Sequence, residues 1–299
     1  YGLPALNRAD FNRIAAETGV PLFWRADAGA AGAVEASEVI VLDADAAKAE
    51  KFVKGTAFTA AFEAAYRSFV EVRRREAVRA ELAQGRPTLI ETDLSQANPQ
   101  DRALVGHFLT IAGLIDELYA FQNGAGGLDE AIPKDDAASR ALFARNHGPW
   151  CEAPKTESDP FCSASPVFAK RRAQSYPPEL EIDPAFCERL AKEPNGQDLI
   201  APFTVVRSKS GGGFDAVPYT TVYGPWMKKI AKELRAAVKG LTSKGEAPLA
   251  AYLSAAASGF ETNAWEPADE AWSAMSGATS KWYVRIGPDE TYWDPCGIK

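Results

Sequence analysis

Apolar residues recur at helical spacing in several stretches of this 299-residue chain, most clearly over 99–122. The stripe there consists of Leu104, Phe108, Ile111, Ile115 and Leu118. Steps of four and three residues place such side chains on one face of a helix. Because further apolar residues flank the stripe, we expect this helix to be nearly encircled by protein.

Two stretches nearer the N-terminus also predict helices. Asn7 is a cap-type residue before an apolar-periodic run that Gly19 closes. Between 43 and 83, Phe62 and Phe69 belong to an apolar stripe in a segment rich in Ala, Glu and Arg, which predicts one long amphipathic helix. Its Glu-Val-Arg-Arg-Arg-Glu run suggests an anion site, but the flanking acidic residues favour a solvated helix face.

The last third of the chain predicts three short helices and two strands. The helices open at Pro225, Pro248 and Pro267, because proline is favoured in the first turn. The run Ala-Pro-Phe-Thr-Val-Val-Arg-Ser at 201–208 is a strand candidate. At 282–286, apolar Trp, Val and Ile alternate with Tyr and Arg, which is strand periodicity.

Composition divides the chain into three segments. Residues 1–122 form a helical N-terminal part, 123–195 a Pro/Gly/Cys-rich irregular insert, and 196–299 helical hairpins with a strand. We expect the three to make one lobe. The fold class predicted is α+β, helix-dominated, with a small β-sheet or barrel.

The four cysteines lie in predicted loops. An even number there fits two disulfides in an exported, periplasmic or extracellular protein. The simplest pairing joins Cys151 to Cys162 and leaves Cys187 with Cys296. Two alternatives stay open: four reduced thiols in a cytosolic enzyme, or a zinc site that uses His147 with the first two cysteines.

Charge and missing motifs narrow the function further. A net charge of −7 argues against a nucleic-acid partner. No apolar run approaches the roughly 18 residues that a membrane span needs. The chain lacks a phosphate loop, a dinucleotide fingerprint and paired zinc-binding histidines, and its two histidines, His107 and His147, are expected to be a core residue and a helix cap. It opens Tyr-Gly-Leu-Pro without an initiator Met, which suggests a removed targeting segment or a trimmed chain.

The stretch Ile-Gly-Pro-Asp-Glu-Thr-Tyr-Trp-Asp-Pro-Cys-Gly, 286–297, carries the candidate chemistry. If the strand at 282–286 continues, Glu290 and Tyr292 project to the same face. A carboxylate there can bind the ammonium of a peptide or amine. A phenol can donate a hydrogen bond to a carbonyl oxygen as it becomes anionic. The alternative is a Glu–Tyr pair that only ties a turn.

This stretch resembles the Ile-Gly-x-x-Glu-[Ser/Thr]-Tyr-x-Asp-Pro-x-Gly motif of the dipeptidyl peptidase III family of zinc metallopeptidases. The matching residues are Ile286, Gly287, Glu290, Thr291, Tyr292, Asp294, Pro295 and Gly297. The resemblance is specific over about 260–297 and suggestive over 99–260. It does not extend to the first 98 residues or to the cysteine-bearing insert.

The resemblance implies a two-lobed enzyme with a broad cleft. One lobe holds zinc through a His-Glu-x-x-x-His helix, and the other carries the Glu-x-Tyr motif. By that pattern Glu290 binds the free N-terminus of the substrate, and Tyr292 stabilises the tetrahedral intermediate. The zinc-binding segment follows this motif in the family, whereas this chain stops at Lys299, so no metal ligand can be carried over.

We therefore expect the substrate-binding lobe of an exported, dipeptidyl-peptidase-like zinc exopeptidase that hydrolyses peptides. The zinc would be held by a segment C-terminal to this chain or by a second chain, and this chain alone would be inactive. The alternative function is a non-catalytic peptide-binding or protein-interaction protein derived from that lobe.

Overall fold

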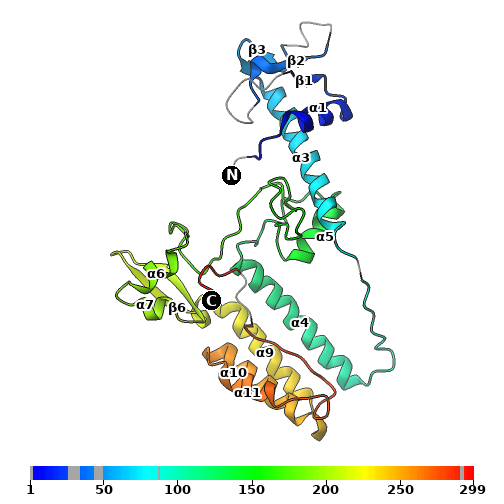
Figure 1. Ribbon diagram of the computed structural model, residues 1–299. Coiled ribbons are helices and arrows are strands. Elements are labelled where there is room, and N and C mark those ends of the chain that lie inside the picture. Colours follow the sequence, from blue (N-terminus) through cyan, green and yellow to red (C-terminus); the bar gives the residue numbers. More distant parts are fainter. Residues whose placement is uncertain (1–2, 26–33, 44–49, 87, 290–292) are drawn as a thin grey trace. The chain divides into compact units, whose positions relative to one another are not determined.

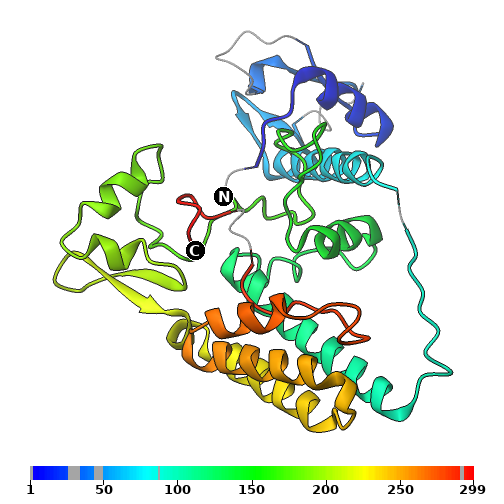
Figure 2. The same ribbon diagram turned by 60° about the horizontal axis from the view of Figure 1, so that its bottom comes forward.

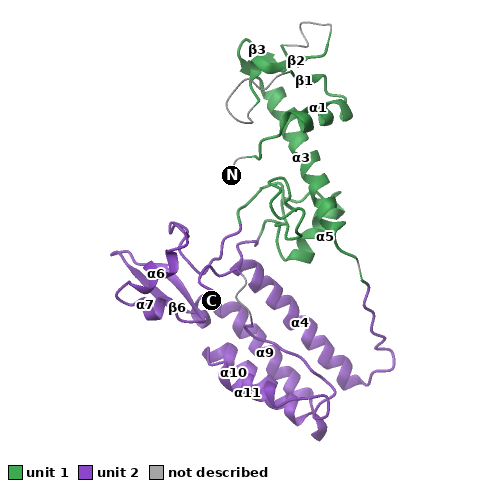
Figure 3. Cartoon of the chain, viewed as in Figure 1, with its two compact units in different colours: residues 1–88, 127–170 green, residues 89–126, 171–299 purple. Residues whose placement is uncertain are grey.

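A computed structural model describes residues 3–25, 34–43, 50–86, 88–289 and 293–299 (Figure 1). The chain forms two compact units (Figure 3). Unit 1 comprises 1–88 and 127–170, and unit 2 comprises 89–126 and 171–299. Each unit is built from two separate stretches of chain, so this division differs from the three consecutive segments 1–122, 123–195 and 196–299 suggested by composition.

The described part of unit 1 combines three helices with two small hairpins and a short 3-10 turn. Its elements are α1 (Arg8–Glu17), β1 (Leu22–Trp24), η1 (Ala36–Glu38), β2 (Val39–Val41), β3 (Val53–Lys54), β4 (Ala57–Phe58), α3 (Ala60–Leu82) and α5 (Ala137–Asn146). Its main core gathers large aromatic side chains from α1, β1 and α3, including Phe11, Trp24, Phe62 and Phe69. The expected cap Asn7 is confirmed, since its side chain accepts a hydrogen bond from Asp10 N at 2.8 Å.

Among the described residues, the long helix expected over 43–83 is confirmed for α3 alone, and residues 44–49 lie outside the described part of the chain. Helix α3 begins after Thr59, whose hydroxyl caps it, and 53–58 form the β3–β4 hairpin instead. The expectation of a solvated arginine face is wrong at Arg74. That side chain is completely buried, because Asp136 and other acceptors surround its guanidinium.

Unit 2 is mainly helical. Its elements are α4 (Pro99–Gln122), α6 (Phe186–Ala191), α7 (Gly196–Leu199), β5 (Thr204–Ser208), β6 (Phe214–Pro218), α8 (Tyr219–Val222), α9 (Gly224–Gly240), η2 (Lys244–Glu246), α10 (Ala247–Thr262) and α11 (Glu266–Ser273). Helix α9 packs between α4 and α10, and α10 packs on α11 (Figure 2). The three expected helix starts are confirmed, with a proline in the first turn of α9, α10 and α11.

Helix α4 is less buried than its sequence predicted. Only Leu104 and Ile111 are buried on it, and Leu109 is 69% exposed. By length and composition α4 is apolar enough to cross a membrane, contrary to the expectation that no stretch approaches this. Since a helix of a soluble protein passes the same test, this is weak evidence for a span.

The β-structure confirms a helix-dominated α+β fold but not a barrel. The described strands make three separate two-stranded antiparallel sheets: β1–β2, β3–β4 and β5–β6. In the last, Thr204 faces Pro218 and Ser208 faces Phe214. The strand expected at 282–286 is wrong, since this segment joins none of the described ladders. Its alternation is nevertheless real, because exposure alternates residue by residue along it.

Candidate functional site

Glu290 and Tyr292, the predicted site residues, lie outside the described residues together with Thr291. The structure describes the chain on both sides, up to Asp289 and from Trp293 onward. The candidate site is therefore built from these two flanks and from the parts of unit 2 that hold them.

The flank before 290 is held by α10. The hydroxyl of Tyr252, a residue 2% exposed, accepts a hydrogen bond from Ile286 N at 2.6 Å and donates one to Ile286 O at 3.2 Å. A β-carbon on the next residue, Gly287, would lie 3.2 Å from the Trp265 ring, and one on Gly259 of α10 would lie 2.7 Å from the same ring. Glycine at both positions therefore lets Trp265 pack directly against helix and motif backbone.

The flank after 292 is held by a carboxylate and a disulfide. Asp294 Oδ2 accepts hydrogen bonds from Cys296 N, Ile298 N and Lys299 N, at 3.2, 2.7 and 3.2 Å. Cys296 is bonded to Cys187 of α6. These contacts fix the backbone immediately after 292 and explain why an Asp–Pro sequence at 294–295 is useful here.

An arginine also packs on this flank. The Arg171 guanidinium lies 3.5 Å from the centroid of the Trp293 ring. Cation–π contacts of this kind contribute about 0.5–2 kcal/mol. Trp293 is thereby oriented by a neighbouring side chain although it is partly exposed.

Both flanks border one pocket of about 530 Å³ within unit 2. This volume lies in the range of small-molecule and cofactor sites, roughly 300–1,000 Å³. One wall is aliphatic and comes from α4 and α9, with Ile115, Leu118 and Met227.

The other wall is a continuous set of aromatic rings. Its members are Phe203, Tyr219, Tyr223, Phe260 and Trp265. Successive ring centroids lie 4.8 Å apart for Tyr219–Tyr223, 6.2 Å for Phe203–Tyr219, 6.2 Å for Phe203–Trp265 and 4.8 Å for Phe260–Trp265. Rings at these separations pack favourably edge to face or tilted. The wall is therefore a rigid apolar surface.

Phe203 takes part in this wall at a conformational cost. Its φ is +58°, a left-handed conformation that non-glycine residues rarely adopt. Its carbonyl accepts hydrogen bonds from Tyr219 N at 2.9 Å and from the Asn263 amide at 3.0 Å. Strained backbone held by such contacts is common where a side chain must point into a binding site.

Charged side chains at the pocket are partly paired with one another. Arg285 contacts Asp269 at 3.1 Å and Asp289 at 3.0 Å, and all three line the pocket with Asp294 and Lys299. Burial lowers the pKa of Lys299 to about 8, although the Asp294 carboxylate acts in the opposite direction. The lining thus contains three carboxylates and two cations, close to electrical balance.

The tyrosines of the aromatic wall stay neutral. Burial raises the pKa of Tyr219, and neighbouring Tyr223 and Asp294 raise it further. Burial likewise raises the pKa of Tyr223. Both phenols therefore keep their protons near neutral pH and can act as hydrogen-bond donors.

Three buried polar atoms of the pocket lining have no hydrogen-bond partner of good geometry among the described residues. They are Tyr223 Oη, Trp265 Nε1 and Asp294 Oδ1. The Tyr223 hydroxyl lies near the side chains of Gln122 and Ser175. Buried polar atoms in proteins are normally bonded, so these three are exceptions among the described residues of the lining.

The cysteines confirm the predicted pairing. Cys151 is bonded to Cys162 and Cys187 to Cys296, and no free cysteine is found in the described chain. The alternatives of four thiols and of a zinc site with His147 are therefore wrong. His147 ends α5 with a left-handed backbone, φ +48°, as expected of a cap.

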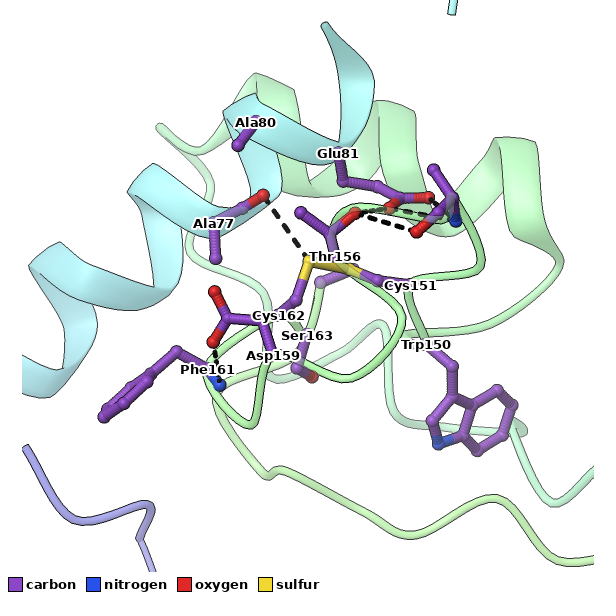
Figure 4. Close-up of a disulfide and its surroundings, with 12 residues drawn as sticks. Ala77, Ala80, Glu81, Trp150, Cys151, Thr156, Asp159, Phe161, Cys162 and Ser163 are labelled. Carbon is purple, nitrogen blue, oxygen red and sulfur yellow. Dashed lines mark hydrogen bonds between the residues drawn. A yellow bond between two sulfur atoms is a disulfide. The ribbon is translucent and has the colours of Figure 1, made fainter. Parts of the chain in front are cut away.

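One cluster of possible metal ligands among the described residues does not fit a zinc ion. A group of three possible ligands is formed by Glu81, Cys151 and Cys162, but its two sulfurs are bonded to each other (Figure 4). The Glu81 carboxylate instead accepts hydrogen bonds from Thr156 and from Ala153 N. A disulfide and a saturated carboxylate leave no open set of ligands.

His107 is not a buried core residue, contrary to the expectation from the sequence. Its side chain is 31% exposed, and Nδ1 lies 2.9 Å from Glu233 Oε2 of α9. It joins α4 to α9 by a polar contact and lies outside the residues that line the large pocket.

Sequence reasoning missed most of the pocket. Trp265 and Tyr223 resembled ordinary apolar positions of helices and turns. Their one sequence signal was a glycine at Gly259 within a helix, which implies a close approach by a neighbouring group.

Comparisons with known proteins agree with this fold. No protein-family model matches the chain. Nudix hydrolase 3 of Arabidopsis thaliana is 22% identical, with 70% of this chain and 33% of that relative covered. The solved structure of dipeptidyl-peptidase III from Corallococcus sp. strain EGB is 23% identical with a TM-score of 0.61, and covers 74% of this chain and 41% of its own.

The structure of DPP III from Caldithrix abyssi is also 23% identical, with a TM-score of 0.55 and coverage of 66% and 37%. The chain thus spans about a third of the curated relative and about two fifths of the solved structures. These findings confirm the resemblance at the level of the fold: this chain has the fold of part of a dipeptidyl-peptidase III structure.

Proposed function

We propose that this chain is the substrate-binding lobe of a zinc-dependent exopeptidase that hydrolyses peptides from their N-terminus. The observation that carries the proposal is the aromatic pocket, which borders the Glu-x-Tyr segment on both sides within a lobe of this fold. A pocket of this size and composition is suited to a peptide side chain.

In this proposal Glu290 binds the free ammonium of the substrate, and Tyr292 donates a hydrogen bond to the carbonyl oxygen as it becomes anionic. Arg285 pairs with both Asp269 and Asp289, so one cation offsets part of the negative charge of these two carboxylates.

The catalytic zinc belongs, in this proposal, to residues outside this chain. On this proposal the chain alone lacks peptidase activity. Export is proposed on the two disulfides, because disulfides persist mainly in oxidising compartments.

Steady-state kinetics on the full-length protein test the proposal. Glu290→Ala should chiefly raise KM and weaken discrimination against N-blocked peptides, because an ammonium contact acts in both ground and transition states. Tyr292→Phe should chiefly lower kcat by about 10²–10³-fold, as for loss of an oxyanion donor.

Matched controls are Glu266→Ala and Tyr283→Phe, at exposed positions away from the pocket lining. An unchanged kcat in Tyr292→Phe would mean that Glu290 and Tyr292 only stabilise a turn. Peptide binding by the full-length protein without hydrolysis would favour the non-catalytic alternative.

A further inference from the structure

We infer that Tyr252 is a positioning residue for the proposed reaction, because it holds the bend at 285–289 from which the chain enters the 290–292 segment. This bend is centred on Gly287. That the segment acts on a peptide rests on the proposed function. The hold on the bend rests on contacts among described residues of unit 2 alone.

The Tyr252 hydroxyl serves both backbone groups of one residue in the bend. It accepts a hydrogen bond from Ile286 N at 2.6 Å and donates one to Ile286 O at 3.2 Å. A phenol hydroxyl has one donor and spare acceptor capacity, so one atom can fill both roles. Among the described residues, no other group bonds to the Ile286 backbone. The bend therefore depends on this hydroxyl at Ile286.

Tyr252 is itself fixed by the helix that carries it. It lies in α10, is 2% exposed, and belongs to a hydrophobic core of unit 2. Burial raises the pKa of its phenol, so the hydroxyl keeps its proton and both hydrogen bonds persist at neutral pH. The helix thus sets where the hydroxyl lies, and the hydroxyl sets where Ile286 lies.

A second contact links the bend to α10 through Trp265. A β-carbon on Gly287 would lie 3.2 Å from the Trp265 ring, and one on Gly259 of α10 would lie 2.7 Å from it. Gly259 follows Tyr252 by seven residues, about two helical turns, so both lie on one face of α10. Two successive residues of the bend are therefore held by the same face of one helix.

The rest of the bend passes this placement on toward residue 290. Arg285 Nε contacts Asp289 Oδ1 at 3.0 Å, which closes the bend across its ends. Arg285 also contacts Asp269 of α11 at 3.1 Å. The ring of Pro288 fixes its φ at about −65°. With few free torsions left, a shift at Ile286 moves Asp289, the last described residue before the segment.

This role differs from contact with the ligand. Tyr252 is not among the described residues that line the pocket, so loss of its hydroxyl removes no group from the lining. Catalytic groups must nevertheless be placed closely, since a misplacement of about 1 Å can cost about 10²-fold in rate. Tyr252→Phe keeps the ring and removes both hydrogen bonds. It should therefore lower activity through the placement of Tyr292.

Steady-state hydrolysis of dialanine p-nitroanilide, which has a free N-terminus, tests this role in two backgrounds of the full-length protein. Tyr252→Phe should lower kcat by about 10–100-fold when Tyr292 is present. In the Tyr292→Phe background the same change should cost less than about 2-fold, because the hydroxyl that it misplaces is absent. A merely structural loss would be equal in both backgrounds.

Hydrogen exchange over 285–289, followed in the chain itself, tests the hold on the bend without any activity. Exchange of the Ile286 amide should be about 3–10-fold faster in Tyr252→Phe, as for loss of one hydrogen bond. Tyr66→Phe is the matched control, since the Tyr66 hydroxyl also accepts a backbone hydrogen bond, from Leu6 N at 2.9 Å, but in unit 1. It should change neither this exchange nor kcat.

Gly287→Ala provides a second test if thermal melts show that Tyr252→Phe does not fold. Its β-carbon would meet the Trp265 ring and displace the bend while Tyr252 stays intact. Its loss of kcat should likewise vanish in the Tyr292→Phe background.

The outcomes separate this inference from the proposed function. Unchanged exchange at Ile286 in Tyr252→Phe would overturn the positioning role alone. So would an unchanged kcat in Tyr252→Phe while Tyr292→Phe loses activity, or an equal loss of kcat in both backgrounds for either variant. An unchanged kcat in Tyr292→Phe would overturn the proposed function, and the positioning role with it.

Discussion

The two units treat their buried polar groups in opposite ways. In unit 1, the fully buried Arg74 guanidinium donates to Asp136 at 2.7 Å, to Ser139 at 2.8 Å, and to the carbonyls of Ser163 and Ala164 at 2.9 and 3.0 Å. In unit 2, three buried polar atoms of the pocket lining, Tyr223 Oη, Trp265 Nε1 and Asp294 Oδ1, have no partner of good geometry among the described residues. Saturated buried groups belong to structure, whereas open ones at a pocket are available to a ligand.

The acidic partners of unit 1 show the same saturation. Burial alone would raise the pKa of Glu81, but hydrogen bonds from Thr156, Glu152 N and Ala153 N hold it below its ordinary value. Burial acts in the same direction on Asp136, and Ser139 and Arg74 again outweigh it, so its pKa is lowered too. The lowered pKa values of Glu81 and Asp136 therefore mark structural contacts of unit 1.

Removal of a disulfide should give the largest loss of stability, and the loss should differ between the two units. Removing Cys187–Cys296 as a Ser/Ser variant should destabilise by about 5 kcal/mol, because it closes a long loop, and removing Cys151–Cys162 by about 3 kcal/mol. The separations are 109 and 11 residues. Denaturant unfolding measures both.

Only the Cys187–Cys296 disulfide should affect the candidate site. Cys187–Cys296 holds the chain just after 292, whereas the other lies in unit 1. Peptide hydrolysis by the full-length protein should fall in Cys187→Ser/Cys296→Ser and stay unchanged in Cys151→Ser/Cys162→Ser. An equal loss in both would contradict the division between the units.

Arg74 tests the saturated network. Arg74→Met should destabilise unit 1 by about 3–5 kcal/mol, because Asp136 is left buried without its counter-charge. Arg235→Met is the control, since Arg235 pairs with Glu261 on the surface and such pairs contribute about 0–1 kcal/mol. Chemical denaturation should separate the two variants, and a stable Arg74→Met protein would show that the network is dispensable.

Acid should weaken the same network more gently, since protonation leaves every atom in place. The folded-state pKa values of Glu81 and Asp136 are lowered. Their stabilisation is thus fully present above the unfolded pKa values, about 4, and is lost as pH falls through the lower folded values. Unfolding measured from pH 6 down to pH 2 should show this fall, and Glu81→Gln with Asp136→Asn should flatten it.

Alanine substitutions at two glycines of unit 2 should change stability least, one lowering it and the other raising it. Gly259→Ala should destabilise by about 1–3 kcal/mol, because the new β-carbon would meet the Trp265 ring at 2.7 Å. Gly113→Ala on α4 should stabilise by about 0.5–1 kcal/mol, since nothing lies within 4 Å of its β-carbon. Thermal melts compare them, and loss of stability in both would mean that the exposed face of α4 is covered.

Local features were readable from the sequence. Asn7 caps α1 and Pro225 opens α9 because capping and first-turn preferences depend only on neighbouring backbone groups. The disulfide pairing also followed, because the nearest cysteines, Cys151 and Cys162, close the shorter loop. Alternation at 282–286 correctly predicted which side chains turn inward.

Only the tertiary structure decided the rest, because it depends on groups far apart in the chain. The segment 282–286 alternates like a strand, but Tyr252, 34 residues before Ile286, bonds its backbone in place of a described partner strand. Arg74 is buried because Ser139 of α5 and Asp136, which precedes α5, accept its hydrogen bonds. The helical stripe of α4 predicted a helix, but only the packing of its neighbours set how much of that helix is covered. Likewise the pocket gathers walls from α4, α9 and α10 beside the motif, a convergence that no local pattern encodes.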